Sequence, residues 1–369
     1  MKILHIIHTP RFSGAEILVK NLSLEHAKKD NIAITAINPT QNNFTGVMNE
    51  LKQSGIELFI PDIKLSKLQR IFHLFKVFKA YHPDIILGHS AIVSAYMRIV
   101  GLFFKEIKKI VVLHATGDYE TNSRLQKAEF ILQYFTDCVV GVSELSSDLY
   151  IKRYHIPRVE TIYNGANLHK IDNTKAYRNK IRQKLFNVSN DDYVILQIGR
   201  VLKVKNHILT VLALSKLPLE MIKFINIFFV GIIEDENYFL KLRNIIKNNN
   251  LENHISFMEP RSDIEKLLAG GDLFVMPSEK EGFSIALIEG LASGLPVICS
   301  DIDGFKFLDK LNFSGVYKFD LSCINIYAEH IKHNYLEKEI NIKRNMQEYE
   351  FAACSQKYFN LLEEVNGKA

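Results

Sequence analysis

Two glutamates, Glu281 and Glu289, stand eight residues apart in a stretch that could bind an anionic, hydroxylated ligand. The apolar run 273–276 closes at Pro277-Ser278, which is typical of a buried strand that ends in a turn. Glu281 lies in the loop that follows, and Glu289 lies within the good helix-forming run 285–292. The free N–H groups and partial positive charge of a helix N-terminus suit a phosphate or sugar hydroxyls.

This stretch, PSEKEGFSIALIEGLASGLPV, resembles the E-x7-E signature of retaining GT-B glycosyltransferases of family GT4. In that family the first glutamate contacts the donor sugar and the second holds the ribose hydroxyls of the nucleotide. The resemblance therefore implies a sugar contact for Glu281, a ribose contact for Glu289 and a donor site that includes Gly282, Phe283 and Ser284. By spacing alone, Glu281 could instead cap the helix and Glu289 could be solvated.

A basic loop, GRVLKVKNH at 199–207, follows the apolar run 193–198 and resembles the loop of the family that holds the donor diphosphate. The match implies that Gly199, Arg200 and Lys205 bind the donor. Negative charge grows on the leaving diphosphate as the sugar–phosphate bond breaks, so fixed cations stabilise the transition state more than the ground state. The other interpretation is a solvated basic turn.

Other donor-side features resemble the family less closely. Gly14, in Ser13-Gly14-Ala15-Glu16, matches a Gly-rich loop near the donor phosphates, although Ser13 stands where glycine is usual. Pro260 and Arg261 match a loop beside the nucleobase, where backbone groups would read the base. Residues 231–234, GIIE, replace the usual GxGP and leave the role of that loop open.

Two histidines end successive predicted strands, His89 in GHS and His114 in VVLHATGD. A histidine at a strand end is commonly structural. The resemblance implies that His114 lies beside the transferred sugar, as a catalytic contact, and it supports His89 less strongly.

No residue grouping has the spacing of a metal site, and we expect no cofactor other than the donor substrate. Asp301 and Asp303 spell D-x-D, a metal–diphosphate motif of a different glycosyltransferase fold. Because they follow a strand in a GT-B pattern, we interpret the match as coincidence. Arg200 and Lys205 would then take the place of a divalent cation.

Short β-rich runs alternate with helical patterns along the whole chain, which predicts parallel sheets covered on both faces. Ligands of such doubly wound α/β folds bind at the carboxyl ends of the strands. The resemblance implies GT-B architecture, with two Rossmann-like domains that face each other across a cleft. We predict an acceptor-side domain over 1–165, a nucleotide-sugar domain over 166–345 and a C-terminal segment, 346–369, that crosses back. The segment from about Leu336 is predicted to be helical.

Composition places the chain among globular proteins, with 369 residues, 47% hydrophobic and 24% charged. The net charge of +5 is mild and no dense Lys/Arg block indicates a nucleic-acid partner. The four cysteines lack C-x-x-C spacing, and the N-terminus lacks the core and cleavage site of a signal peptide. We therefore expect a cytoplasmic protein with free thiols.

One stretch bears on location, because residues 64–79 mix five basic residues with leucines and phenylalanines at helical spacing. Such a helix can lie on an anionic membrane surface, at the inner face of the plasma membrane, or simply cover a sheet with a solvated basic face.

The resulting hypothesis is a retaining glycosyltransferase that moves a hexose or N-acetylhexosamine from a nucleotide-diphosphate sugar to a glycan or polyprenyl-linked acceptor in bacterial surface-polysaccharide synthesis. A dinucleotide oxidoreductase is disfavoured, since HTPRFSGAE stands where G-x-G-x-x-G would be needed. A non-catalytic nucleotide-sugar-binding protein or a nucleotide-sugar epimerase of the same architecture remains an alternative.

Overall fold

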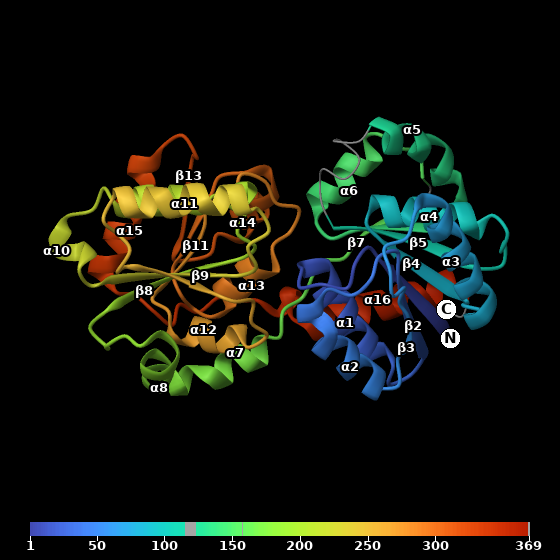
Figure 1. The fold of residues 1–369 in the computed structure, drawn as a ribbon, viewed down its shortest axis with the longest axis horizontal. Helices are drawn as coiled ribbons and strands as arrows, with labels where there is room; N and C mark the ends of the chain where they lie inside the picture. Colours follow the sequence, from blue (N-terminus) through green and yellow to red (C-terminus); the bar gives the residue numbers. More distant parts are fainter. Residues whose placement is uncertain (115–122, 157, 368–369) are drawn as a thin grey trace. The chain divides into compact units, whose positions relative to one another are not determined.

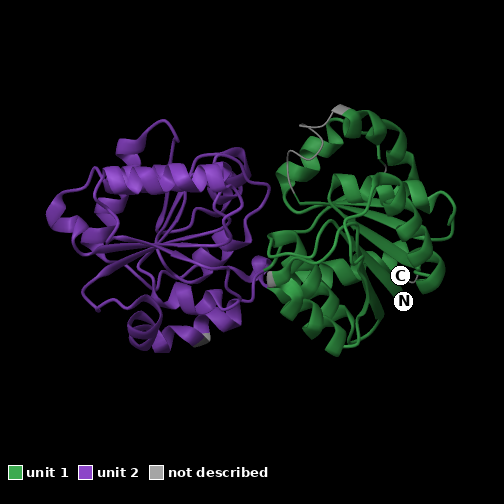
Figure 2. Cartoon of the chain, in the orientation of Figure 1, with its two compact units in different colours: residues 1–165, 351–369 green, residues 166–350 purple. Residues whose placement is uncertain are grey.

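The chain forms two α/β units, each built on its own parallel sheet (Figures 1 and 2). A computed structural model describes all residues except 115–122, 157 and 368–369. Unit 1 contains Met1–Gly165 together with the segment that starts at Phe351, and unit 2 contains Ala166–Glu350. The chain thus passes between the units twice, at 165/166 and at 350/351. The sequence had placed the second boundary after residue 345.

Unit 1 has a seven-stranded sheet in the order β3-β2-β1-β4-β5-β6-β7, and its recorded strand pairs are all parallel. Its strands are β1 (Lys2–Ile7), β2 (Asn31–Ala36), β3 (Glu57–Phe59), β4 (Ile85–His89), β5 (Lys108–Leu113), β6 (Cys138–Gly141) and β7 (Val159–Thr161). Its helices are α1 (Gly14–His26), α2 (Thr45–Gln53), α3 (Lys67–Tyr81), α4 (Ala91–Gly101), α5 (Ser123–Leu132), α6 (Glu144–Ile151) and α16 (Phe351–Val365).

Helices cover both faces of this sheet. α3 and α4 bury one core against it, and α1 packs with α2 and α16. Because strand side chains alternate between faces, the core residues Leu4 and Ile6 of β1 lie on the α4 face, and His5 points to the opposite one. Ser66 caps the N-terminus of α3: its hydroxyl accepts from Gln69 N in a complete capping box.

Unit 2 has a six-stranded parallel sheet in the order β10-β9-β8-β11-β12-β13. Its strands are β8 (Tyr193–Ile198), β9 (Ile225–Val230), β10 (Ile255–Met258), β11 (Leu273–Met276), β12 (Val297–Ser300) and β13 (Val316–Phe319). Its helices are α7 (Leu168–Thr174), α8 (Arg178–Ile181), α9 (His207–Leu214), α10 (Leu219–Ile222), α11 (Glu236–Asn248), α12 (Ile264–Gly270), α13 (Ile285–Ala292), α14 (Phe307–Leu311) and α15 (Ile324–Glu337). α9, α11 and α15 share one core with the sheet, and α7, α8, α12 and α13 pack with one another on the other side (Figure 1).

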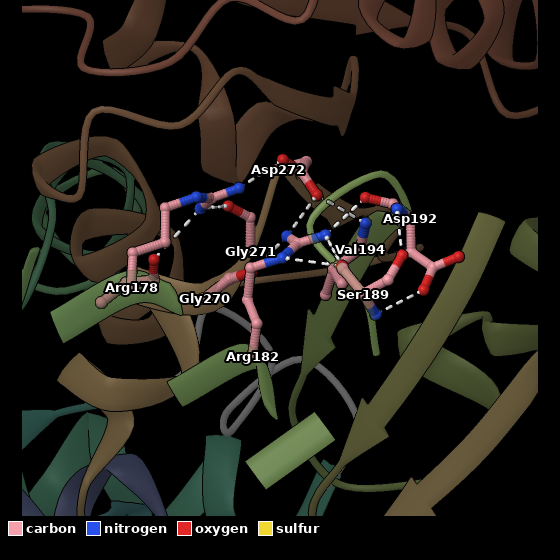
Figure 3. A network of polar contacts seen from close by, with 9 residues as sticks. Arg178, Arg182, Ser189, Asp192, Val194, Gly270, Gly271 and Asp272 are labelled. Atoms are coloured by element: carbon pink, nitrogen blue, oxygen red, sulfur yellow. Dashed lines mark hydrogen bonds and ion pairs between the residues drawn. The ribbon is translucent and has the colours of Figure 1, made fainter. Parts of the chain in front are cut away.

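The composition of residues 175–186 predicts one basic helix, and this prediction is wrong for a single element. Lys175–Tyr177 form a 3₁₀ turn, α8 is one turn long, and Arg182–Phe186 form a π-helix. The reason is a polar network around Asp272, drawn in Figure 3. The Asp272 carboxylate accepts from Arg178 at 2.5 Å, from Arg182 at 2.8 Å and from the backbone N–H of Val194 at 2.7 Å. These contacts bind the segment to the amino ends of β8 and β11, and they set its winding.

The continuous helix predicted from about Leu336 is also wrong. α15 ends at Glu337, Lys338 adopts a left-handed backbone (φ 49°), and the segment up to Met346 has no helix or strand. Ile342 N donates to Gly294 O at 2.9 Å and Arg344 donates to Leu291 O at 2.7 Å. Side-chain and backbone contacts with the rest of unit 2 therefore hold this segment in a non-helical path up to Met346, before the 3₁₀ turn Gln347–Tyr349 and α16.

Candidate functional site

The carboxyl ends of the strands of unit 2 bring the two strongest sequence motifs together. β8 and β11 are neighbours in the sheet, so the loop after β8, with Lys205, and the loop after β11, with Glu281, meet. Lys205 Nζ donates to Glu281 Oε1 at 2.5 Å, and Ser278 Oγ donates to the same oxygen at 2.7 Å. Both members of the ion pair are largely buried, with side-chain exposures of 14% and 11%. Glu281 is therefore held in one orientation by two donors.

A glycine is required where the next loop crosses Glu281. A Cβ atom at Gly304 would lie 2.2 Å from the carbonyl oxygen of Glu281, far inside van der Waals contact. The chain after β12 thus passes directly against the backbone that carries the carboxylate. A side chain at Gly304 would displace Glu281.

Arg200 pairs with Glu234, in the loop after β9. Arg200 Nη1 and Glu234 Oε2 are 2.5 Å apart, and about a third of each side chain is exposed. The two loops approach closely because Gly231 has no side chain: a Cβ there would lie 2.1 Å from Gly199 O. Arg200 and Lys205 thus each pair with a carboxylate in this structure, at the carboxyl ends of neighbouring strands.

Helix α13 is set tightly against the sheet behind this cluster. Ser284 caps it by accepting from Leu287 N at 3.3 Å, and a Cβ at Gly290 would lie 2.7 Å from the ring of Phe274 on β11. The Phe283 ring packs against Phe307 and Tyr349, with centroids 5.5 and 6.1 Å apart. Gly282 is half-buried between Glu281 and this aromatic cluster. The loop that carries Glu281 is thereby fixed at both ends.

Glu289 lies in the middle of α13 and is half-buried. Its carboxylate accepts no hydrogen bond from the part of the chain that the structure describes. Burial, and secondarily the charge of Glu265, raises the pKa of Glu289 to about 8. The alternative of a freely solvated carboxylate does not fit this burial. A half-buried carboxyl group without donors among the described residues is suited to ligand hydroxyls.

The predicted nucleobase loop lies at the edge strand β10. Pro260 is half-buried, and Arg261 makes a double hydrogen bond to Asp263, at 2.7 and 2.8 Å. The Arg261 side chain thus stabilises its own loop, which leaves backbone groups to face a ligand. β10 is separated from β8 by β9, so this loop lies farther along the same edge of the sheet.

The aspartates of the D-x-D triplet are paired with lysines. Asp301 lies 2.6 Å from Lys318 Nζ, and Asp303 pairs with Lys306 in the same 3₁₀ turn. Outside the undescribed ranges 115–122, 157 and 368–369, no three His, Cys, Asp or Glu side chains are grouped as metal ligands.

Unit 1 holds the remaining candidates. His114 directly follows β5, and its Nε2 lies 2.9 Å from Nδ1 of His89 at the end of β4. Burial lowers the pKa of His114 to about 4. Gly14 is exposed at the first position of α1, where the hydroxyl of Ser13 donates to the carboxylate of Glu16. The residues that follow His114, 115–122, lie outside the described part of the chain.

Three residues that pair with predicted site residues had been given no role from the sequence. They are Ser278, which pairs with Glu281, Glu234, which pairs with Arg200, and His5, which pairs with His89. The sequence signal for Ser278 was its place at the end of a predicted strand. The signal for Glu234 was its place in GIIE, which departs from the usual GxGP. His5 was visible as the polar residue within the buried strand KILHII. Their pairings depend on strand neighbours, which the order of residues along the chain does not reveal.

Comparison with known proteins places both units in one enzyme class. The family model described as Glycosyltransferase Family 4 matches residues 12–170, and the one described as Glycosyl transferases group 1 matches 178–320. An Escherichia coli UDP-Gal:α-D-GlcNAc-diphosphoundecaprenol α-1,3-galactosyltransferase is 23% identical over 93% of this chain and 90% of its own length. The Staphylococcus aureus capsular polysaccharide biosynthesis glycosyltransferase CapH is 23% identical over 82% of each chain.

Solved structures agree on the fold. Anabaena HepE in complex with UDP and glucose superimposes with a TM-score of 0.83 at 20% identity and covers 99% of this chain and 100% of HepE. The predicted pair of parallel α/β domains is thus confirmed as GT-B. With one family model on each half of the chain and relatives along its length, the chain belongs to the GT4-type glycosyltransferases of GT-B fold.

Proposed function

We propose that this glycosyltransferase moves a hexose or N-acetylhexosamine, with retention of configuration, from a nucleotide-diphosphate sugar to a glycan or polyprenyl-linked acceptor in bacterial surface-polysaccharide synthesis. The observation that carries the proposal is the cluster of Lys205, Glu281 and Ser278 at the carboxyl ends of β8 and β11. The names of the relatives support the donor and acceptor classes: one uses UDP-galactose and a diphosphoundecaprenol-linked acceptor, and another serves capsule synthesis.

In this proposal Arg200 and Lys205 bind the diphosphate and stabilise its charge as the bond to the sugar breaks. Lys205 lies within 2.5 Å of Glu281, so a diphosphate bound to the lysine places the sugar against that carboxylate. Glu281 then orients the sugar, and Glu289 binds the ribose hydroxyls. The predicted contacts of Gly14, Gly199, Gly282 and Ser284 with the donor belong to the same proposal.

The chemical step exchanges one C–O bond for another on the same face of the sugar. The anomeric carbon loses the phosphate oxygen and gains the acceptor oxygen, and the acceptor proton passes to the leaving phosphate. Glu281 Oε1 accepts from Lys205 and Ser278, so this scheme gives Glu281 an orienting role and leaves the acceptor proton to the leaving phosphate. His114 contacts the sugar in this scheme, and no metal is needed.

The test is a panel of nucleotide sugars incubated with the purified protein, with nucleotide diphosphate release measured with and without EDTA. We expect slow release from one donor, unaffected by EDTA, and accelerated by a lipid-linked acceptor. Lys205→Ala should lower kcat/KM about 100-fold, the usual cost of one charge-stabilising donor. Lys203→Ala, which removes an equal charge from an exposed position in the same loop, should leave it unchanged.

Three outcomes would count against the proposal. Release abolished by EDTA would make Asp301 and Asp303 candidate metal ligands. Nucleotide-sugar binding without release, even with acceptors, would favour the non-catalytic binding protein. An inverted anomeric centre in the product, determined by NMR, would exclude the retaining mechanism.

A contact with the inner face of the plasma membrane is part of the same proposal, because α3 and α4 of unit 1 expose aromatic and basic groups together. Among the described helices, none is both long and apolar enough to cross a bilayer. Leu68 and Phe72 of α3 are 69% and 65% exposed, and Phe103, which follows α4, is 72% exposed. Phe75 belongs to the same exposed group, since its ring centroid lies 6.0 Å from that of Phe103. The exposed lysines of α3 are Lys67, Lys76 and Lys79.

Such a surface combines apolar insertion with attraction to anionic lipids. Replacing Lys67, Lys76 and Lys79 with glutamate should abolish sedimentation with anionic vesicles. A control with the same change in charge replaces Lys216, Lys241 and Lys247, which are exposed on unit 2, and should sediment like the wild type. Equal sedimentation of both triple variants would contradict the membrane contact.

A further inference from the structure

Three histidines form a diagonal row across the sheet of unit 1. His5 of β1 is level with Leu87 of β4, and His89 stands two residues beyond Leu87. His89 is level with Val112 of β5, and His114 stands two residues beyond Val112. Because side chains alternate with a period of two, steps of two keep all three rings on one face of the sheet. That face is opposite the core formed with α4.

The three rings are joined in sequence by hydrogen bonds. His5 Nδ1 lies 3.0 Å from His89 Nε2, and His89 Nδ1 lies 2.9 Å from His114 Nε2. His5 stacks on His89 with centroids 5.3 Å apart, and His89 lies 5.2 Å from His114. His5 is fully buried and His89 is 2% exposed, whereas His114 remains half-buried. The row thus runs from the interior to the point where the chain leaves β5.

Burial keeps the row uncharged. It lowers the pKa of His5 to about 3 and that of His114 to about 4, and it lowers the pKa of His89 well below the usual value. A neutral imidazole has one N–H donor and one acceptor nitrogen. Each ring can therefore donate to only one neighbour, so the two hydrogen bonds must point the same way along the row.

The inner end sets that direction. His5 Nε2 is buried and has no hydrogen-bond partner. If His5 carried its proton there, an N–H donor would be buried unpaired, which proteins avoid more strictly than an unpaired acceptor. The proton therefore lies on His5 Nδ1 and is donated to His89 Nε2. His89 must then carry its own proton on Nδ1, donate it to His114 Nε2, and leave the His114 proton on Nδ1.

We propose that His5 and His89 are positioning residues that fix His114 as a neutral donor with its proton on Nδ1. This inference rests on the proposed function, in which His114 contacts the transferred sugar. In that setting a fixed Nδ1–H donates to a sugar oxygen. A neutral ring also avoids the repulsion that an imidazolium would exert on the positive charge that develops at the anomeric carbon.

The direct test is long-range ¹H–¹⁵N NMR of protein labelled with ¹⁵N-histidine, with the His114 signals identified from a His114→Gln variant. The expected spectrum at pH 7 shows His5, His89 and His114 as single neutral tautomers protonated on Nδ1. A proton on Nε2 of His114, or an even mixture of tautomers, overturns the proposal. The tautomers are read from the unmodified protein without donor, and the variant serves only to assign signals, so the measurement does not depend on turnover.

Variants then test whether the row acts through His114. In His89→Leu, His114 should be a mixture of its two neutral tautomers. In His89→Asn, an amide N–H takes the place of the His89 Nδ1–H donor, and His114 should again be a single tautomer protonated on Nδ1. The matched control is His73→Gln, at a half-buried histidine of unit 1 that bonds to Thr35 Oγ1 outside the row, and it should leave the His114 spectrum unchanged. An unchanged His114 tautomer in His89→Leu contradicts the proposal.

Kinetics give the functional readout. His89→Leu should lower kcat for donor turnover about tenfold with little change in the donor KM, which is the usual range for losing a group that orients a functional side chain. In a His114→Gln background the same change should have no further effect. An equal loss in both backgrounds shows that His89 acts independently of His114 and overturns the inference. A protein with the expected tautomers but no turnover of any donor refutes the proposed function instead.

Discussion

Glu281 and Glu289 belong to one loop-and-helix segment, yet their surroundings differ sharply. Glu281 accepts from Lys205 and Ser278, whereas Glu289 has no donor among the described residues and is half-buried. Burial raises the pKa of Glu289 to about 8, so its carboxyl group is largely protonated at pH 7. A protonated carboxyl can both donate to and accept from a diol, which suits the proposed ribose contact.

Glu289 should also make the folded protein less stable as pH rises. Its pKa is about 8 when folded against 4.5 when unfolded, so the folded state binds the extra proton between these values. Stability is unaffected below pH 4.5 and is lost progressively up to pH 8. Glu289→Gln should remove this loss and be more stable than the wild type by up to about 5 kcal/mol at pH 8.5, given 1.36 kcal/mol for each pKa unit.

The measurement is urea unfolding of both proteins from pH 5 to pH 8.5. The difference between the two free energies of unfolding isolates Glu289, because the other titrations are common to both. Glu252→Gln, at an exposed carboxylate of unit 2, should give a curve parallel to the wild type. A Glu289→Gln curve that is also parallel would show that the Glu289 carboxyl is ionised in the folded protein.

At this scale the sequence was informative about residue types and silent about pairing. Glu281 and Lys205 could be selected because a carboxylate and a lysine at strand ends fit a resemblance. Their direct contact could not be predicted, because it requires β8 and β11 to be neighbours in the sheet. In sequence, 74 residues lie between Ile198 and Leu273, and β9 and β10 are among them. The row of His5, His89 and His114 depends on register in the same way.

At the scale of elements, α4 and α5 are joined by a buried ion pair. Arg98 and Glu129 are 0% and 1% exposed and form two hydrogen bonds, of 2.7 and 2.5 Å. Thr136 accepts from Arg98 at 3.1 Å, and Tyr150 donates to Glu129 at 2.5 Å. The pair therefore also reaches the segment after α5 and helix α6. Its hydrogen bonds are satisfied, which is the condition under which buried charges are tolerated.

Removing one charge of this pair should be strongly destabilising. Glu129→Gln leaves the Arg98 guanidinium buried without its counter-charge, and such changes cost about 3–5 kcal/mol. Urea unfolding at pH 7 measures the loss. The control is Glu160→Gln, at an exposed ion pair with Arg158 in the same unit, which should cost about 0–1 kcal/mol. Similar losses in both variants would indicate that Arg98 finds another partner or water.

The elements that the sequence predicted well are the buried strands and the helices that pack on them, since continuous apolar runs mark both. The edge strands β7 and β13 were missed because their residues are mostly half-buried and give no such run. Residues 175–186 were predicted as one basic helix because composition does not reveal which partners the arginines bind. In the structure they bind Asp272 and backbone carbonyls (Figure 3).

At the scale of the whole molecule, the chain completes unit 1 only after it has built unit 2. Helix α16 packs on α1, and its side chains Tyr358, Leu361 and Leu362 are almost fully buried. His26 at the end of α1 bonds to Ser355 O at 3.2 Å. The sequence predicted a returning segment by resemblance, whereas the burial of these three side chains shows that unit 1 needs it for its own core.

Deleting residues 351–369 should therefore destabilise unit 1 and spare unit 2. Each of the three large side chains contributes about 1.5–3 kcal/mol by burial, and the deletion also exposes the apolar surface of α1 beneath them. Hydrogen exchange followed by mass spectrometry resolves the two units, and the deletion should remove most of the protection of β1 and β4 while that of β8 and β11 remains. Tyr358→Ala is the milder version and should lower protection in unit 1 alone. Loss of protection in both units to the same extent would show that the units unfold together, and that α16 stabilises the molecule as a whole.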